Sequence, residues 1–191
     1  MNSVELYDTT LRDGAQSWGV HFSVEDKLRI ARKLDELAID FIEGGYPGSN
    51  PKDRRFFSSI RDLRLKHARV VAFGNTCRAD MPCENDPQIK NLVETKTETA
   101  TIVGKSWDLH VTDVLAVPLQ KNITMVSDTI QFIRPHSKKI IFDAEHFFDG
   151  FKNNREYALS TLKSAMTAGA DLVVLCDTNG GTLPTEVSAI I

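Results

Sequence analysis

Charged and polar side chains gather at six places along this chain, and each place follows a short apolar run. Carboxylates dominate these places, with arginine and histidine beside them. Carboxylate oxygens and imidazole nitrogens bind divalent metal ions, and the same groups move protons in general acid–base catalysis. The residue types therefore predict a site for a metal ion and for proton transfer. The polar segments are residues 8–16, 43–48, 74–76, 106–110, 143–146 and 177–181.

Each of these residues also has a simpler interpretation. Asp-Thr and Asp-Gly pairs are common in turns, because Asp caps a loop and Gly adopts positive φ. Arg12 and Asp13 could be a surface pair, Glu145 a loop carboxylate, and His110 a helix-start or core histidine. A single instance would favour the turn interpretation, but six in succession favour a functional site.

The apolar runs are strand-sized and regularly spaced. Their C-terminal ends lie between 30 residues apart (Gly74 to Gly104) and 39 residues apart (Gly104 to Asp143). This is the length of a strand plus a returning helix. The runs predict six strands, at residues 3–7, 40–43, 69–73, 99–103, 139–142 and 171–176.

The segments between these runs have helical periodicity. Residues 23–38 carry one apolar stripe, with Ser23 and Asp26 placed as a capping box at the start. A second helix is predicted where an apolar stripe closes at Gly169, which is placed as a C-cap glycine. The stripes are Leu28, Ala31, Leu34, Leu37 and Ala38 in the first helix, and Ala158, Leu162, Ala165 and Met166 in the second. Further helices are predicted at residues 53–63, 88–94 and 122–133.

The alternation of strands and helices predicts an α/β fold with a parallel sheet. Spacing alone leaves open whether the sheet is doubly wound or closed into a barrel. A complete (β/α)₈ TIM barrel needs about 250 residues, so about six βα units in 191 residues would make the barrel incomplete. In both architectures the active site lies at the C-terminal ends of the strands.

Composition excludes several classes of protein. Lys and Arg number 23 against 26 Asp and Glu, a net charge of −3, which argues against a nucleic-acid binder. No apolar stretch approaches the roughly 20 residues that span a membrane, and the N-terminus has no secretory signal pattern. Cys77, Cys83 and Cys176 form no CxxC pair, which predicts reduced, buried thiols and a cytoplasmic protein.

Four motifs carry a family resemblance. DTTLRDGAQ at residues 8–16 resembles the opening signature of 2-isopropylmalate, homocitrate and citramalate synthases and of HMG-CoA lyases. EGGYPGSNPKD (43–53) and FDAEHFFDG (142–150) resemble the citramalate synthase branch, and LCDTNGGTLP (175–184) continues the pattern. The resemblance implies that residues 1–191 are part of a catalytic TIM-barrel domain of the HMGL-like, pyruvate carboxyltransferase type.

The resemblance implies an acyltransferase that condenses acetyl-CoA with a short 2-keto acid and then hydrolyses the thioester. Pyruvate would give citramalate, and 2-ketoisovalerate would give 2-isopropylmalate. It implies that Asp13 binds a divalent metal (Mg, Mn or Zn), Arg12 stabilises the enolate or keto oxygen, and Glu145 takes part in acid–base chemistry. Thr178 would hold the keto-acid carboxylate, while Glu43 and His110 match substrate-binding positions. Small-molecule substrates and a homodimer are expected, without nucleic acid or membrane partners.

One family feature is missing from the sequence. Relatives supply two metal ligands from a His-x-His motif, and none of the five histidines lies two residues from another. We therefore expect a fragment of a longer synthase that stops before the seventh strand. Two alternatives stay open, namely a lyase that cleaves a C–C bond and a non-catalytic fragment that binds a partner or keto acid.

Overall fold

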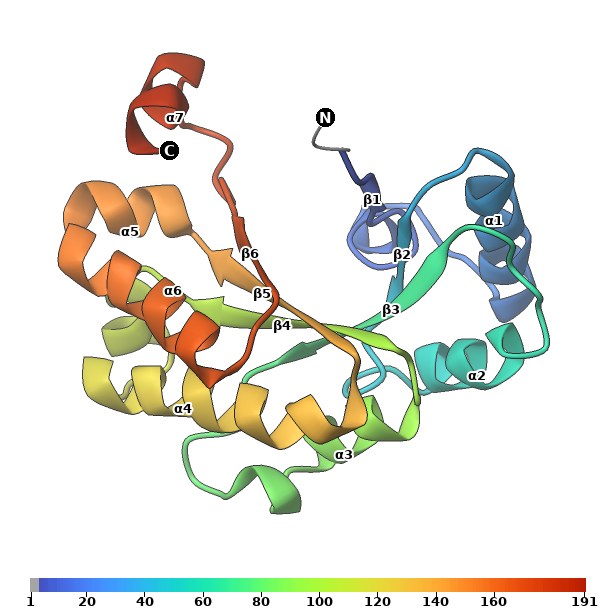
Figure 1. Cartoon of the computed structure of the whole chain (residues 1–191), viewed down its shortest axis with the longest axis horizontal. Coiled ribbons are helices and arrows are strands. Elements are labelled where there is room, and N and C mark those ends of the chain that lie inside the picture. Colours follow the sequence, from blue (N-terminus) through green and yellow to red (C-terminus); the bar gives the residue numbers. More distant parts are fainter. Residues whose placement is uncertain (1–3) are drawn as a thin grey trace. The chain divides into compact units, whose positions relative to one another are not determined.

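A computed structural model describes residues 4–191 as six strands alternating with helices (Figure 1). The strands follow one another in the sheet in sequence order, from β1 to β6. β1 pairs in parallel with β2, β2 with β3, and β5 with β6. The predicted βα alternation is thus confirmed. The strands are β1 Tyr7–Asp8, β2 Phe41–Gly45, β3 Arg69–Asn75, β4 Thr99–Lys105, β5 Lys139–Glu145 and β6 Leu172–Leu175.

Seven α-helices lie between and after these strands in the described residues. They are α1 Val24–Glu36, α2 Pro51–Ile60, α3 Pro87–Glu94, α4 Leu119–Ile133, α5 Phe147–Asn153, α6 Arg155–Ala168 and α7 Pro184–Ile190. A π-helical turn covers His110–Val114. The five predicted helices are all present, while α5 and α7 were not among them. Across residues 4–191, no helix combines the length and the apolar character needed to cross a lipid bilayer.

The first strand differs from its prediction. The strand was predicted at residues 3–7, of which Ser3 lies outside the described residues, and β1 covers only Tyr7–Asp8. The connection to the neighbouring strand starts one residue earlier, because the Leu6 carbonyl accepts the amide protons of Asp40 and Phe41 at 3.1 and 3.0 Å. Backbone pairing, rather than the apolar run, therefore sets where this strand begins.

Contacts divide the chain into two compact units. The first comprises Met1–Gly74, Pro87–Thr101 and His136–Lys138, and the second comprises Asn75–Asp86, Ile102–Pro135 and Lys139–Ile191. Each unit has its own core. Phe41, Ile42, Phe56 and Phe57 are buried in the first, and Ile130, Ile141, Phe142 and Phe147 are buried in the second.

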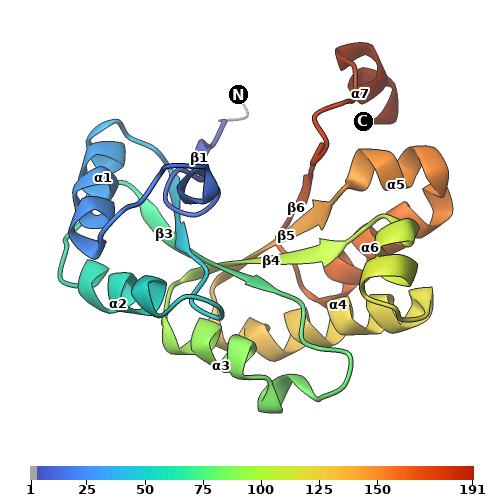
Figure 2. The same ribbon diagram turned by 180° about the vertical axis from the view of Figure 1, so that it is seen from behind.

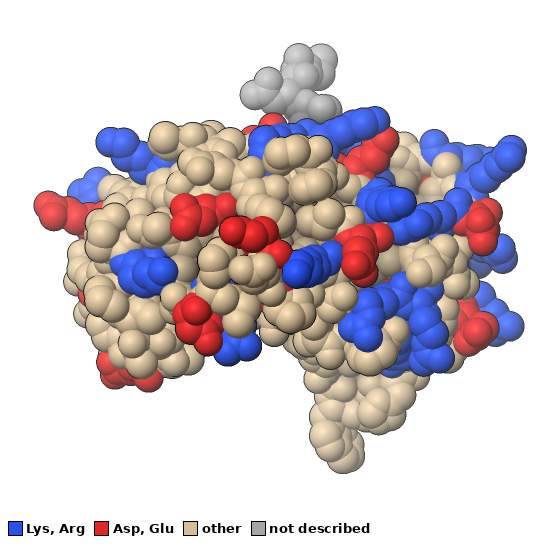
Figure 3. All heavy atoms as spheres, turned by 90° about the horizontal axis from the view of Figure 1, so that it is seen from below, with Lys and Arg blue, Asp and Glu red and all other residues tan. Residues whose placement is uncertain are grey.

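In the first unit, α1 begins with the predicted capping box. Ser23 Oγ accepts the Asp26 amide proton at 3.0 Å, and the Asp26 carboxylate accepts the Ser23 amide proton at 3.0 Å. The helix ends at Glu36, earlier than predicted, because Ala38 has a left-handed φ of 58°. Leu37 therefore lies outside the helix and is 71% exposed, so the predicted stripe is wrong at its end. Figure 3 shows Lys and Arg side chains gathered over α1 and α2, with acidic side chains among them.

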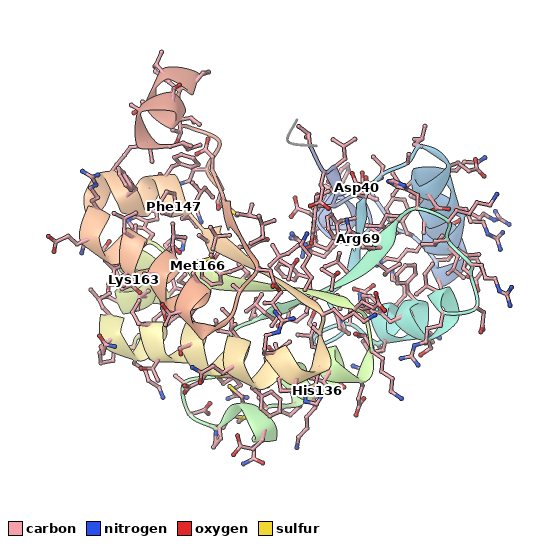
Figure 4. The ribbon with its side chains drawn as sticks, in the orientation of Figure 1. Asp40, Arg69, His136, Phe147, Lys163 and Met166 are labelled. Carbon is pink, nitrogen blue, oxygen red and sulfur yellow. The ribbon has the colours of Figure 1, made fainter. Side chains whose placement is uncertain are left out.

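The starts of β2 and β3 lie together in the first unit. The Arg69 amide donates to the Asp40 carbonyl at 2.9 Å, and Figure 4 shows the two residues close to each other at these strand ends. The Arg69 guanidinium stacks on the Phe41 ring at 4.0 Å and pairs with Glu5. Pairing at these N-terminal ends fixes the register of the strands whose other ends carry the predicted site residues.

In the second unit, α4 and α6 lie side by side, as Figures 1 and 2 both show. Ser164 Oγ of α6 donates to the Ile123 carbonyl of α4 at 3.1 Å. The predicted C-cap is confirmed, since α6 ends at Gly169 with φ 110°. Thr161 is buried in this helix whereas Met166 is 51% exposed, so Met166 was wrongly assigned to the apolar stripe.

The three cysteines, all within the described residues, form no disulfide. Cys77 and Cys83 are buried in the second unit, as predicted, while Cys176 is half-buried. Burial, together with the neighbouring Cys77 sulfur, raises the pKa of Cys83 to about 12. Cys83 is therefore a neutral thiol at physiological pH.

Candidate functional site

A first cluster of polar residues lies in the first unit, and we call it the Arg12 cluster. It consists of Tyr7, Arg12, Asp13, Glu43 and Thr101. Arg12 Nε donates to Glu43 Oε2 at 2.6 Å, and Arg12 Nη1 donates to Asp13 Oδ1 at 3.0 Å. Tyr7 OH donates to Glu43 Oε1 at 2.9 Å and contacts Thr101 Oγ1 at 2.7 Å. Both oxygens of Glu43 are thus occupied by protein donors.

The Glu43 side chain is completely buried, whereas that of Asp13 is 65% exposed. Burial raises the pKa of Glu43, because loss of water outweighs the opposite pull of the Arg12 guanidinium and the Tyr7 hydroxyl. Arg12 also lies over the Phe73 ring at 4.1 Å. The guanidinium is therefore held between a carboxylate and an aromatic face.

A buried ion pair anchors the backbone of β2 next to Glu43. Lys27 Nζ donates to Asp53 Oδ1 at 2.5 Å and to the Gly44 carbonyl at 3.0 Å, while Asp53 Oδ2 accepts the Tyr46 amide proton at 2.9 Å. Gly45 has φ 147°, and a Cβ at this position would overlap the Asp53 carboxylate. Only glycine fits there, which explains part of the EGGYPG motif.

A second cluster lies in the second unit, and we call it the Glu145 cluster. It consists of Lys105, His110, Glu145, His146 and Thr178. Glu145 ends β5 and pairs with Lys105, which ends β4. The Lys105 and Glu145 side chains are 26% and 27% exposed. Glu145 is therefore accessible from solvent, unlike Glu43.

The backbone around Lys105 is fixed by buried side chains. Asn122 Nδ2 donates to the Lys105 carbonyl at 2.8 Å and to Tyr157 OH at 2.7 Å. The Ser106 amide donates to the Glu145 carbonyl at 3.1 Å, which joins the two strand ends. Gly150 packs so closely on the Ser106 carbonyl that a Cβ would overlap it. These contacts hold Lys105 and Glu145 next to each other.

One ring nitrogen of His110 has no hydrogen-bond partner among the described residues. This nitrogen, Nδ1, is buried, and the ring stacks on Trp107 with centroids 4.9 Å apart. The His146 ring lies edge-on to it at 4.3 Å. Burial lowers the pKa of His110, and the nearby His146 and Lys105 lower it further. His110 is therefore a neutral imidazole at pH 7.

His146 has an unusual backbone conformation. Its φ of 54° and ψ of 34° are left-handed, which is uncommon for residues other than glycine. Its amide donates to Thr178 Oγ1 at 2.9 Å, and its Nδ1 lies 3.2 Å from Asp149 Oδ2. The same Asp149 oxygen accepts a hydrogen bond from Asn179 at 3.0 Å.

The structure groups the predicted site residues into two sets. Arg12, Asp13 and Glu43 come together in the first unit. In the second unit, His110 lies within electrostatic range of Glu145, and Thr178 contacts the residue that follows Glu145. The predicted roles of these six residues are still predictions.

Sequence reasoning missed several residues of these clusters. Tyr7 and Lys105 stand at strand ends, where a polar residue after an apolar run was the available signal. His146 was noted among the polar residues but given no role, because nothing in the sequence reports a left-handed φ.

The described residues do not form a metal site by themselves. Across residues 4–191, no group of three or more His, Cys, Asp and Glu side chains is arranged to hold a metal ion. Asp13 Oδ1 is engaged by Arg12, whose positive charge opposes a cation at the same oxygen. A single carboxylate does not fit a catalytic metal, which usually has three protein ligands.

Comparison with known proteins gives the class of protein. The HMGL-like family profile matches residues 3–191, and the chain belongs to this family. The chain is 53% identical to (R)-citramalate synthase of Aquifex aeolicus over 98% of its length, and 49% identical to that of Geobacter sulfurreducens over its full length. It is 30% identical to 2-isopropylmalate synthase of Listeria innocua over 97%. The chain spans about a third of these relatives, 35%, 36% and 35% of their lengths respectively.

Solved structures show the fold. HMG-CoA lyase of Pseudomonas aeruginosa matches 98% of this chain, and 62% of its own, with a TM-score of 0.74 at 16% identity. HMG-CoA lyase of Brucella melitensis matches 98% of this chain, and 66% of its own, with the same TM-score and identity. The α/β fold of the TIM-barrel type is thereby confirmed, with six strands in the described residues.

Proposed function

We propose that the protein is an acyltransferase that condenses acetyl-CoA with a short 2-keto acid, and that pyruvate is the preferred keto acid, giving citramalate. The observation that carries this proposal is the 53% identity to a citramalate synthase over 98% of the chain, against 30% to a 2-isopropylmalate synthase. The motifs EGGYPGSNPKD and FDAEHFFDG, which resemble the citramalate branch, support the same choice.

We assign Arg12 to the oxygen that becomes negative during condensation. A guanidinium held by Glu43 and Phe73 is preorganised, so it stabilises developing charge without first having to reorient. Glu43 then acts on the substrate indirectly, by fixing Arg12. This proposal refines the predicted substrate-binding role of Glu43.

We assign Glu145 to proton transfer at the acetyl methyl group. Removal of one methyl proton gives the enolate, which forms the C–C bond to the keto carbon, and water then cleaves the thioester to release CoA. Glu145 suits the first step because its carboxylate is partly exposed. Thr178 is assigned to the carboxylate of the keto acid, and neutral His110 to a substrate oxygen.

The remaining proposals concern the surroundings of the reaction. We infer a cytoplasmic homodimer that acts on small molecules. A divalent metal at Asp13 stays a prediction, since the described donors do not suffice to hold one.

The test is an assay of CoA release from acetyl-CoA with pyruvate, 2-ketoisovalerate or no keto acid, with and without Mg²⁺, Mn²⁺ or Zn²⁺. We expect release that depends on pyruvate, with citramalate identified by mass spectrometry. A parallel incubation with HMG-CoA tests the lyase alternative. Cleavage of HMG-CoA without condensation, or binding of pyruvate by folded protein without product in any condition, would refute the proposal.

A further inference from the structure

The hydroxyl of Thr178 is held by one contact that leaves it a donor. Thr178 is exposed in the loop after β6, and its oxygen accepts the His146 amide proton at 2.9 Å. A hydroxyl that accepts a hydrogen bond still has its own proton to donate. Among the described residues no acceptor for that proton is recorded, so it is available to a bound carboxylate.

The partner that fixes this hydroxyl is itself strained. His146 has a left-handed φ of 54°, and residues other than glycine adopt this conformation only where surrounding contacts enforce it. The imidazole of His146 is 11% exposed and lies on the Asp149 carboxylate. The side chain therefore anchors the turn that directs the amide N–H toward Thr178.

Asp149 contacts both the residue that donates the amide proton, His146, and the loop that carries Thr178. One of its oxygens, Oδ2, lies 3.2 Å from His146 Nδ1 and accepts from Asn179 Nδ2 at 3.0 Å. Asn179 follows Thr178 directly, so the carboxylate ties together the donor turn and the loop that carries the hydroxyl. A backbone hydrogen bond from the Phe147 amide to the Cys176 carbonyl, at 3.1 Å, joins the same turn and loop. We call His146, Asp149 and Asn179 the Asp149 clamp.

We propose that the Asp149 clamp positions the Thr178 hydroxyl and thereby sets the affinity for the 2-keto acid. The proposal rests on the role assigned to Thr178 in the proposed function. Partly exposed polar contacts contribute little to stability, so stability alone does not account for a strained residue at this position. His146, Asp149 and Asn179 are positioning residues, because they act through Thr178.

The test is a double-mutant cycle on pyruvate binding, measured by titration of the folded chain with pyruvate. Thr178→Val should weaken binding roughly tenfold or more, as expected for a hydrogen bond to a charged group. Asp149→Ala should weaken it about threefold to tenfold. The double variant should bind no more weakly than Thr178→Val, because the clamp acts only through the hydroxyl.

Two further variants separate positioning from general stability. Asp149→Asn keeps an acceptor oxygen and should restore most of the affinity. Asp171→Ala is the matched control, because Asp171 precedes β6 and its Oδ2 also accepts two hydrogen bonds, from Arg134 Nη1 and the Ile140 amide, at 2.7 Å each. Asp171→Ala should leave pyruvate affinity unchanged whatever it does to the melting temperature.

Several results would overturn the proposal. The first is absence of pyruvate binding to the folded unmodified chain, and the second is an Asp149→Ala variant that binds pyruvate normally. The third is a double variant whose loss of affinity equals the product of the losses caused by Asp149→Ala and Thr178→Val alone. Product formation is measured separately. Citramalate production with uncoupled effects would refute the clamp alone, whereas coupled effects without product would refute the proposed function alone.

Discussion

The Arg12 cluster and the Glu145 cluster each place one strand glutamate against one cation, yet the two glutamates differ in their exposure to solvent. The Glu43 side chain is completely buried and holds donors from both Arg12 and Tyr7. The Glu145 side chain is 27% exposed, with Lys105 as its recorded ion-pair partner. Glu43 within β2 and Glu145 at the end of β5 are thus the same residue type in environments that suit different roles.

A carboxylate that moves a substrate proton must reach the substrate, and one that orients a neighbour must not be drawn away from it. Glu145 meets the first requirement and Glu43 the second. The comparison predicts that Glu145 variants lose turnover while keeping stability, and that Glu43 variants lose stability.

The largest expected effect is that of Glu145→Gln on turnover. The amide keeps the shape of the side chain but cannot accept a proton, so turnover should fall roughly a thousandfold, within the range for a general base. The measurement is kcat for CoA release with pyruvate, together with deuterium exchange from solvent into the acetyl methyl group.

Glu156→Gln is the matched control for that experiment, because Glu156 is an exposed glutamate of α6 in the same unit. It should change neither turnover nor exchange. If Glu145→Gln retained both, Glu145 would not be the base, and the contrast between the clusters would no longer concern catalysis.

The next effect is on stability. Glu43→Ala should lower the free energy of unfolding by about 3 kcal/mol, because it leaves a cavity and removes the acceptor of two partly buried donors. Glu145→Ala, at the end of β5, should cost less than about 1 kcal/mol, as usual for a solvent-accessible ion pair. Urea denaturation measures both. Equal losses would show that access does not distinguish the two glutamates.

A smaller effect is expected for Lys105→Met. Loss of the ammonium frees Glu145 to adopt other rotamers, so we expect turnover to fall about tenfold, equivalent to about 1.4 kcal/mol, with stability changed by less than about 1 kcal/mol. Lys152→Met is the control, since Lys152 pairs with Glu186 at 3.5 Å away from the cluster. Turnover unaffected by Lys105→Met would mean that Glu145 is oriented without it.

The strands were predictable because their apolar runs end where polar residues begin, and β3 to β5 start at the predicted residues. Helix α5 was not predictable from the sequence, because Gly150 interrupts its helical pattern. A glycine is needed at this position because the Ser106 backbone lies too close for a Cβ. The six candidate site residues were predicted from their positions after apolar runs and from the family resemblance, and their roles are still predictions. The partners of the two glutamates were not predicted, since Tyr7 becomes a neighbour of Glu43, and Lys105 a neighbour of Glu145, only through strand pairing.

Buried charge was equally invisible in the sequence. Lys27 lies on a helix rich in charged residues, where an exposed position is the ordinary expectation, yet it is 2% exposed. Its partner Asp53 is 26 residues away, and only the packing of α1 against α2 brings them together. Local pattern fixes which face of a helix is apolar, but not which charge finds a buried partner.

The smallest expected effect tests whether burial dominates at Glu43. Because burial raises the pKa of Glu43 above the usual 4.5, the folded state retains this proton at pH values where the unfolded state has lost it. The stability contributed by this group is therefore fully present below about pH 4.5 and is lost as pH rises through the raised pKa. Glu43→Gln has no proton to lose there. The unfolding free energy of the unmodified chain should thus fall relative to Glu43→Gln, by at most about 1.4 kcal/mol per pH unit.

The control for this pH series is Glu36→Gln, since Glu36 is an exposed glutamate of α1 that pairs with Lys33. Its difference from the unmodified chain should not show the same fall. If the stability of the unmodified chain rose with pH relative to Glu43→Gln, the attraction of Arg12 would outweigh burial. Glu43 and Arg12 would then form a net stabilising ion pair, and the two clusters would differ only in access. If the unfolding free energy of the unmodified chain instead falls with pH relative to Glu43→Gln, the buried carboxylate of Glu43 lowers the stability of the fold. Its role in orienting Arg12 would then explain why a glutamate occupies this position.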